Sequence, residues 1–99
     1  MLNITKTIEN GSALIALEGR LDTITAPMLE DAVKEVLPGL NALTLDFEKL
    51  EYISSAGLRV LLMAQKTMAA QGDMKVVQVS DTIREIFDVT GFSEILTIV

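Results

Sequence analysis

The sequence predicts an α/β fold in which helices, mainly on one face, cover a mixed, mostly parallel sheet opened by an antiparallel hairpin. Near the N-terminus an Asn-Gly turn signal separates two staggered apolar segments. Farther along, segments with helical spacing alternate with strand-like segments. Such alternation is typical of right-handed crossovers between parallel strands.

The hairpin is expected to join residues 2–8 to residues 13–19 (ALIALEG). Leu2, Ile4 and Ile8 are staggered with polar residues in the first segment. The next segment, TAPMLEDAVKEVLPG, has apolar residues at helical spacing and is predicted to be a helix. Its inward side comprises Leu29, Ala32, Val33, Val36 and Leu37.

The ends of this first helix carry recognisable signals. Thr25 and Pro27 suit its start, and Glu30 with Asp31 is expected to favour the dipole of its first turn. A Pro-Gly pair at 38–39 is expected to end it. The following stretch, ALTLDF (42–47), alternates cleanly between apolar and polar residues, which predicts a strand covered well on only one face.

Three further elements and a short terminal strand complete the prediction. A helix follows the serines at 54 and 55 and ends near residues 71–73, and MKVVQV (74–79) is a fourth strand. Ser80 is expected to cap a third helix that ends at Thr90-Gly91, with Ile83, Ile86 and Phe87 inward. The C-terminal TIV is expected to be a short last strand.

The carboxyl ends of parallel strands share one edge of a sheet, where such folds place their sites. That edge is expected to carry Asp22, Ser54, Ser55 and Ser80. One of the adjacent serines is accounted for as a helix N-cap. The other is open to two interpretations, a catalytic nucleophile or a switch.

A serine nucleophile needs a base and an oxyanion hole. The chain has no His, and SSAG is not a nucleophile-elbow motif, so the sequence predicts a protein that is not an enzyme. A switch needs only modification: phosphate on a serine at a helix N-terminus adds a charge of about −1.5 to −2. The helix dipole and free N–H groups tolerate that charge, and the modification changes what can dock there.

The helix after the serines is apolar on two sides. We assign one stripe to the core: Leu58, Leu61, Leu62, Gln65 and Ala69. The opposite side carries Val60, Met63, Ala64 and Thr67. That side either packs under a neighbouring helix or faces a partner. Arg59 and Lys66, on a third side, are either solvated charges or partner contacts, and the small Ala56 and Gly57 leave room for a partner's backbone.

The composition restricts the class of partner. The net charge is −6 over 99 residues, which argues against nucleic acid and against anionic membrane surfaces. There is no Cys, no apolar run of membrane-spanning length and no secretory signal pattern at the N-terminus, so we expect a cytoplasmic protein without direct membrane contact. We also expect no metal and no cofactor, because His/Cys ligand sets and phosphate-binding glycine loops are missing.

Three segments carry a recognisable pattern: EGRLDTITAPML, LTLDFEKLEYISSAGLRVLL and VSDTIREIFDVTGFSEIL. Together they resemble the STAS domain family, specifically the small bacterial anti-sigma factor antagonists. Because the likeness runs the whole length, it implies a single STAS domain over residues 1–99.

The family signature is usually Asp-Ser-Ser/Thr-Gly-Leu, in which the serine after the Asp is phosphorylated. Aligned on Gly57-Leu58, Ser55 takes the phosphorylated position and Ser54 takes that of the Asp, while Ala56 replaces the second hydroxyl. The resemblance therefore implies phosphorylation of Ser55, with Ser54 as the second candidate. Asp22 matches an acidic residue of the family's neighbouring loop, and it equally suits a cap of the turn that follows it.

The resemblance implies a cycle of partner switching. The unphosphorylated protein would bind an anti-sigma factor that is also a serine kinase, phosphorylation would release it, and a PP2C-type phosphatase would reset the cycle. The partner-binding residues are expected to be Asp22, Thr23, Ser54, Ala56, Gly57, Arg59, Val60, Met63 and Thr67. The alternative is a STAS subunit of an ABC-type lipid transport complex or another transporter, without phosphorylation and with the serines as caps.

Overall fold

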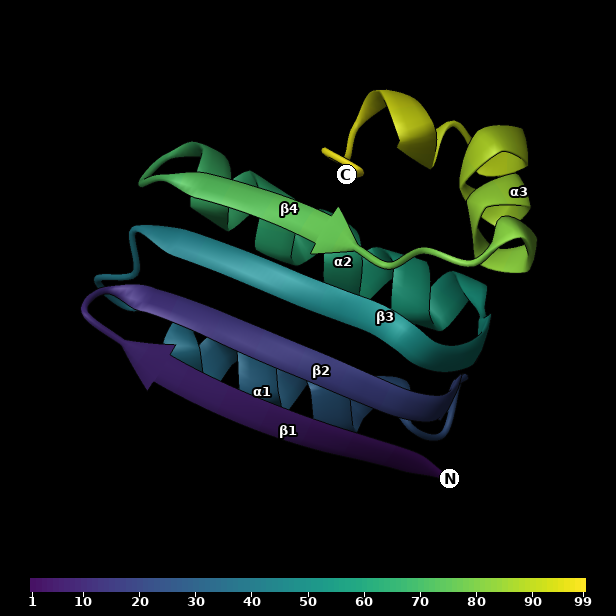
Figure 1. Ribbon diagram of the computed structural model, residues 1–99, viewed down its shortest axis with the longest axis horizontal. Coiled ribbons are helices and arrows are strands. Elements are labelled where there is room, and N and C mark those ends of the chain that lie inside the picture. The colour runs from purple at the N-terminus through teal and green to yellow at the C-terminus, as the bar shows by residue number, and fades with distance from the viewer.

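The computed structural model describes residues 1–99, and its four strands form one sheet in chain order (Figure 1). The first two strands, β1 (Leu2–Glu9) and β2 (Ser12–Leu21), pair antiparallel. The next two, β3 (Ala42–Ile53) and β4 (Asp73–Val77), continue the sheet in parallel. The predicted mixed, mostly parallel sheet with an opening hairpin is therefore confirmed.

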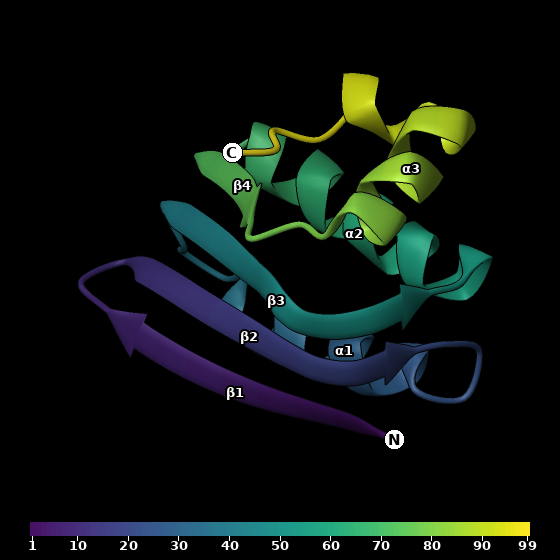
Figure 2. The same cartoon turned by 45° about the vertical axis from the view of Figure 1, so that its right-hand side comes forward.

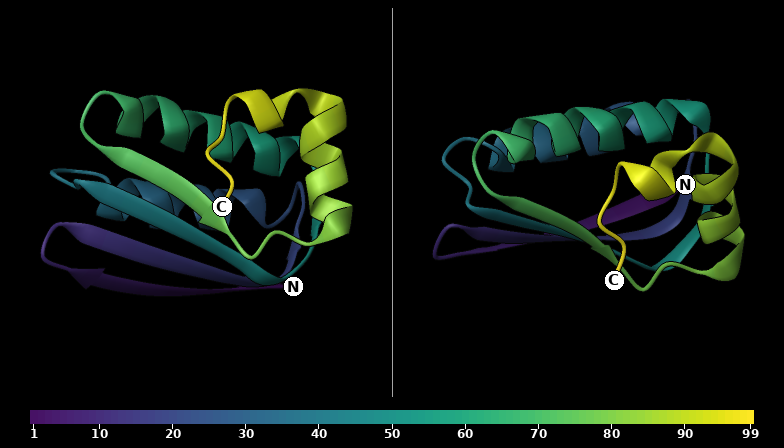
Figure 3. Two further views of the ribbon diagram at one scale, coloured as in Figure 1. Left: turned by 45° about the horizontal axis from the view of Figure 1, so that its top comes forward. Right: turned by 90° about the horizontal axis from the view of Figure 1, so that it is seen from above.

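Two helices, α1 (Ala26–Val36) and α2 (Ser55–Ala69), lie side by side on one face of the sheet (Figures 1 and 3). The third, α3 (Asp81–Thr90), lies beyond β4 at the edge of the sheet and leads into a short 3₁₀ helix, Phe92–Glu94. The opposite face of the sheet carries no helix (Figure 3). None of the helices has the length and apolar character needed to cross a lipid bilayer.

The hairpin depends on two glycines. Asn10 and Gly11 have φ angles of 51° and 82°, and these positive values are the ones that a tight two-residue hairpin turn requires. At the other end of the hairpin, a Cβ on Gly19 would lie 2.1 Å from the carbonyl oxygen of Met1. Only a glycine allows β1 to approach β2 so closely there.

The core lies between the sheet and the two covering helices, and it joins 26 buried residues in one cluster. All five residues predicted for the inner side of α1 are buried, and all of them except Ala32 belong to this cluster. The expectation that Glu30 and Asp31 favour the dipole of the first turn of α1 is wrong, because the helix begins at Ala26 and both residues lie past that turn. Glu30 instead forms an ion pair with Lys34 at 2.9 Å.

Strand β3 runs to Ile53, beyond the predicted 42–47. Its register with β2 shifts twice: Phe47 and Glu48 together oppose Leu17, and Glu51 is an extra residue before Tyr52. These two β-bulges change the spacing of buried residues from two to three, and β3 bends in its second half (Figure 2). The alternation of apolar and polar residues that predicts a strand therefore stops at Phe47, although β3 itself continues to Ile53.

The C-terminal part differs from the prediction in one element. β4 ends at Val77, because Gln78 has a φ of 59°, and Ser80 caps α3 by accepting a hydrogen bond from the N–H of Ile83 at 3.2 Å. Gly91 ends α3 in the left-handed conformation, as predicted. The expected last strand TIV is wrong: this segment makes only one isolated bridge, between Ile98 and Val76.

Candidate functional site

The loop from β2 to α1 and the turn from β3 to α2 meet at the carboxyl ends of their strands. The backbone N–H of Ser54 donates a hydrogen bond to the carbonyl of Leu21 at 2.8 Å. This bond places Asp22, the next residue along the chain, beside the two serines. The fold therefore brings together three of the four residues predicted for this edge, while Ser80 caps α3 elsewhere.

The two serines have different structural roles. Ser54 has an extended backbone and is the N-cap of α2, and its hydroxyl oxygen accepts a hydrogen bond from the N–H of Gly57 at 3.4 Å. Ser55 is the first residue of the helix and is exposed. Its hydroxyl takes part in none of the side-chain hydrogen bonds of the chain and lies at the surface.

The loop before α1 is held by an internal network of hydrogen bonds. One carboxylate oxygen of Asp22 accepts hydrogen bonds from the N–H groups of Ile24 and Thr25, both at 3.0 Å. The hydroxyl of Thr25, a 5% exposed residue, accepts from the N–H of Asp22 at 2.9 Å and donates to the carbonyl of Arg20 at 2.8 Å. Asp22 therefore caps its own turn, which is one of its two predicted roles.

These contacts also set the charge state of Asp22. The hydrogen bond from the Thr25 backbone N–H is the largest cause that holds the pKa of the Asp22 carboxyl below its ordinary value of 3.8. Desolvation of the carboxyl opposes it, but further hydrogen bonds from the Thr25 hydroxyl and the Ile24 N–H lower the pKa again. Nearby Arg20 acts in the same direction. Asp22 is consequently a fixed negative charge beside the serines at neutral pH.

Gly57 allows the first turn of α2 to rest directly on the strand ends. A Cβ at this position would lie 2.7 Å from Cγ of Leu21 and 2.9 Å from Cγ1 of Ile53. Both side chains are buried, so neither can move aside easily. The glycine of the SSAG motif is therefore required by packing against the core, and it offers no surface to a partner.

The side of α2 opposite the predicted core stripe is mostly covered by its own domain. Val60 is 6% exposed and Ala64 is fully buried, because this side faces α1. Met63 and Thr67 are half-buried, whereas Ala69, predicted to lie in the core, is exposed. Of the two alternatives for this side of α2, packing under a neighbouring helix therefore holds for Val60 and Ala64. The predicted placement of Ala69 in the core is wrong.

A hollow of about 330 Å³ opens between the N-terminal halves of α1 and α2. Five predicted partner-binding residues line it: Thr23, Ala56, Arg59, Val60 and Met63. Ala26, Pro27 and Glu30 of α1 complete the lining, and none of these three was predicted. The sequence signal for them is weak, because only the packing of α1 against α2 shows which side of α1 borders the hollow.

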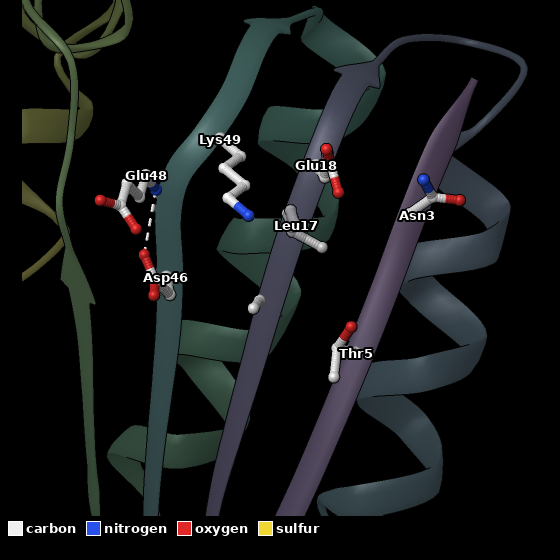
Figure 4. A pocket seen from close by; sticks show the side chains of 8 residues that line it. Asn3, Thr5, Leu17, Glu18, Asp46, Glu48 and Lys49 are labelled. Carbon is white, nitrogen blue, oxygen red and sulfur yellow. Dashed lines mark hydrogen bonds between the residues drawn. The ribbon is translucent and has the colours of Figure 1, made fainter.

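A second hollow, of about 200 Å³, lies on the open face of the sheet (Figure 4). Its wall is strongly polar, with Glu18, Asp46 and Glu48 around Lys49, which extends from β3 toward β2. The carboxylate of Asp46 accepts a hydrogen bond from the backbone N–H of Glu48 at 3.0 Å and so supports the first β-bulge. None of the predicted site residues lies in this hollow.

A family model described as "Mlab, STAS domain" matches residues 4–98, and the chain belongs to the STAS domain family. Among curated proteins, it is 32% identical over 99 residues to a putative anti-sigma factor antagonist, BtrV, of Bordetella bronchiseptica. That match covers 98% of this chain and 85% of the relative.

Solved structures show the same fold. An anti-sigma factor antagonist from Mycobacterium paratuberculosis superposes with a TM-score of 0.89 at 23% identity, covering 99% of this chain and 85% of that one. The unphosphorylated form of the antagonist SpoIIAA superposes with a TM-score of 0.83 at 18% identity, covering 98% and 88% of the two chains. At these identities the likeness establishes the fold, and the site must be argued from its own residues.

Proposed function

We propose that this chain is an anti-sigma factor antagonist whose residues 1–99 act as a single STAS domain. Without modification it binds an anti-sigma factor through the junction of β3 with α2 and the adjoining hollow. Phosphorylation of Ser55 releases that partner. The observation that carries the proposal is the contrast between the serines: Ser54 is engaged as the cap of α2, while Ser55 is exposed with a free hydroxyl.

The relatives support the class of partner. BtrV is named as a putative anti-sigma factor antagonist and matches this chain over most of both lengths. The Mycobacterium tuberculosis protein RsfB, named as an anti-sigma-F factor antagonist, is 28% identical over 94 residues. A role as a transporter subunit is not favoured by these names, and no contact in the site requires it.

The chemistry of the cycle belongs to the partners. In the forward step the Ser55 hydroxyl oxygen forms a bond to the γ-phosphorus of ATP, ADP leaves, and the hydroxyl proton passes to a base of the kinase. In the reverse step a PP2C-type phosphatase adds water, restoring the hydroxyl and releasing inorganic phosphate. This chain acts in the cytoplasm as the substrate of both steps and as a binding protein, not as an enzyme.

The phosphorylation site is tested with the purified anti-sigma factor kinase from the same organism and Mg-ATP. Mass spectrometry of the wild type is expected to place one phosphate on Ser55. Ser55→Ala is expected to accept no phosphate. Ser54→Ala is expected to remain a substrate, because Ser54 serves as the cap of α2 and Ser55 is still present. Full phosphorylation of Ser55→Ala, at another residue, would contradict the assignment.

The docking surface is tested with a pair of matched charge insertions on α2. Met63→Glu places a carboxylate in the hollow and is expected to weaken binding to the anti-sigma factor at least tenfold, as hot-spot substitutions do. Ala69→Glu adds the same charge at an exposed position near the end of the helix and is expected to leave the affinity unchanged. Equal affinities for both variants would move the interface away from the hollow.

A further inference from the structure

Arg59 lies one helical turn after Ser55, on the same side of α2. Residues four apart in a helix have Cβ atoms about 5–6 Å apart, so their side chains can meet. Arg59 is exposed and forms neither of the two ion pairs of the chain. Its guanidinium group is therefore a free cation within reach of whatever Ser55 carries.

The surroundings of Arg59 leave this cation without a permanent partner. It lines the hollow between α1 and α2 together with Glu30, but the carboxylate of Glu30 is already bound by Lys34 at 2.9 Å. The remaining neighbours in the lining are neutral, among them Thr23, Ala56 and Met63. Arg59 is consequently the free charged group that the unmodified protein presents at this hollow.

A phosphate on Ser55 changes that situation. A phosphoserine carries a charge of about −1.5 to −2 at neutral pH and three acceptor oxygens. A guanidinium group binds such oxygens through two parallel N–H donors, which makes the pair both directional and stronger than an ordinary hydrogen bond. Both groups lie on one rigid helix, so they meet without any rearrangement of the backbone.

We propose that the phosphate on Ser55 is bound by Arg59 of the same helix, and that this pair withdraws Arg59 from the hollow. The proposal rests on the proposed function, because it explains how modification of Ser55 alters the partner's binding surface. Release then has two parts, the new negative charge itself and the loss of a cation that contacts the partner. The second part depends on Arg59 alone.

The pair is tested without any partner, in the full chain with phosphoserine incorporated at position 55 during translation. A ³¹P NMR titration gives the second pKa of the phosphate in the wild type, in Arg59→Gln and in Arg84→Gln, an exposed arginine on α3. We expect the pKa to be lower in the wild type and in Arg84→Gln than in Arg59→Gln, because a nearby cation favours the dianion. The same pKa in all three proteins would overturn the pair.

Its effect on release is tested by the ratio of the dissociation constants of the phosphorylated and unmodified proteins for the anti-sigma factor. Arg59→Gln is expected to reduce this ratio by roughly two- to fivefold relative to the wild type, the range of exposed ion pairs. The same ratio in Arg59→Gln and in the wild type would contradict the proposal that phosphorylation withdraws Arg59 from the partner. A wild-type ratio near one would contradict the proposed function instead, while the titration would still decide whether the pair forms.

Discussion

The loop from β2 to α1 and the turn from β3 to α2 lie side by side, but different forces hold them. The first is held by hydrogen bonds that use the side chains of Asp22 and Thr25. The second is held by the close packing of Gly57 on Leu21 and Ile53 and by one long capping hydrogen bond that the N–H of Gly57 donates to the hydroxyl of Ser54. The side chains of Asp22 and Thr25 are therefore engaged in hydrogen bonds within the first loop, whereas the second turn leaves the hydroxyl of Ser55 free.

This difference shows how a fold can keep one reactive group available. A turn held by side-chain hydrogen bonds engages the same atoms that a kinase or a partner would need. A turn held by packing needs no polar side chain beyond its cap. The next serine, Ser55, can therefore be modified without loss of folding stability. Substitutions in the two segments test that division of roles.

The largest effect is expected at Gly57. Gly57→Val forces a branched side chain against Leu21 and Ile53 and is expected to lower the free energy of unfolding by about 3 kcal/mol, the upper part of the range for overpacked cores. Urea denaturation followed by circular dichroism measures the loss. Ala69→Val, at an exposed position of the same helix, is the control and is expected to cost only about 0.5 kcal/mol. Equal losses would mean that packing does not hold this junction.

The next effect concerns Thr25, on the other side of the comparison. Thr25→Val keeps the shape of the side chain but leaves the Asp22 N–H and the Arg20 carbonyl without their partner. We expect a loss of about 1–2 kcal/mol in the free energy of unfolding. Thr23→Val, at an exposed threonine of the same loop, should leave stability within about 0.5 kcal/mol of the wild type. A neutral Thr25→Val would remove the evidence that hydrogen bonds hold the loop.

A smaller effect separates the two serines. Ser54→Ala removes the cap of α2 and is expected to cost about 0.5–1 kcal/mol, the low end for N-caps because the bond is long at 3.4 Å. Ser55→Ala is expected to leave the free energy of unfolding unchanged. Thermal unfolding of both variants measures the difference. If Ser55→Ala were the more destabilising, the hydroxyl at 55 would have a structural role and the contrast between the serines would fail.

The smallest effect is a pH dependence that arises from Asp22. Its folded pKa lies below 3.8, so the unfolded chain binds more protons in the window between the folded pKa and 3.8. The stabilisation from Asp22 is therefore complete above that window and is lost as the pH falls through the folded pKa. Asp22→Asn should flatten this part of the stability profile, measured by urea denaturation in acid. An identical profile in the variant would show that other carboxyl groups cause the acid sensitivity.

Several elements were predictable because their signals are local. The positive φ angles at Asn10-Gly11, the cap at Ser80 and the end of α3 at Gly91 follow from short-range chemistry, and the inner side of α1 follows from helical spacing. The second half of β3 was not predictable in this way. Its two bulges arise from pairing with β2, a segment about 30 residues away, and they erase the alternation of period two.

Alternation, capping and turn preferences act between near neighbours in the chain, so the order of strands and helices and the position of two adjacent serines at a strand-to-helix junction can be derived from the amino-acid sequence alone. Three features cannot be derived in this way: which serine is engaged, which side of α2 is buried under α1 and where the hollow beside Arg59 opens. Those features depend on contacts between α1, α2 and the strand ends. Such contacts exist only after distant segments have packed together.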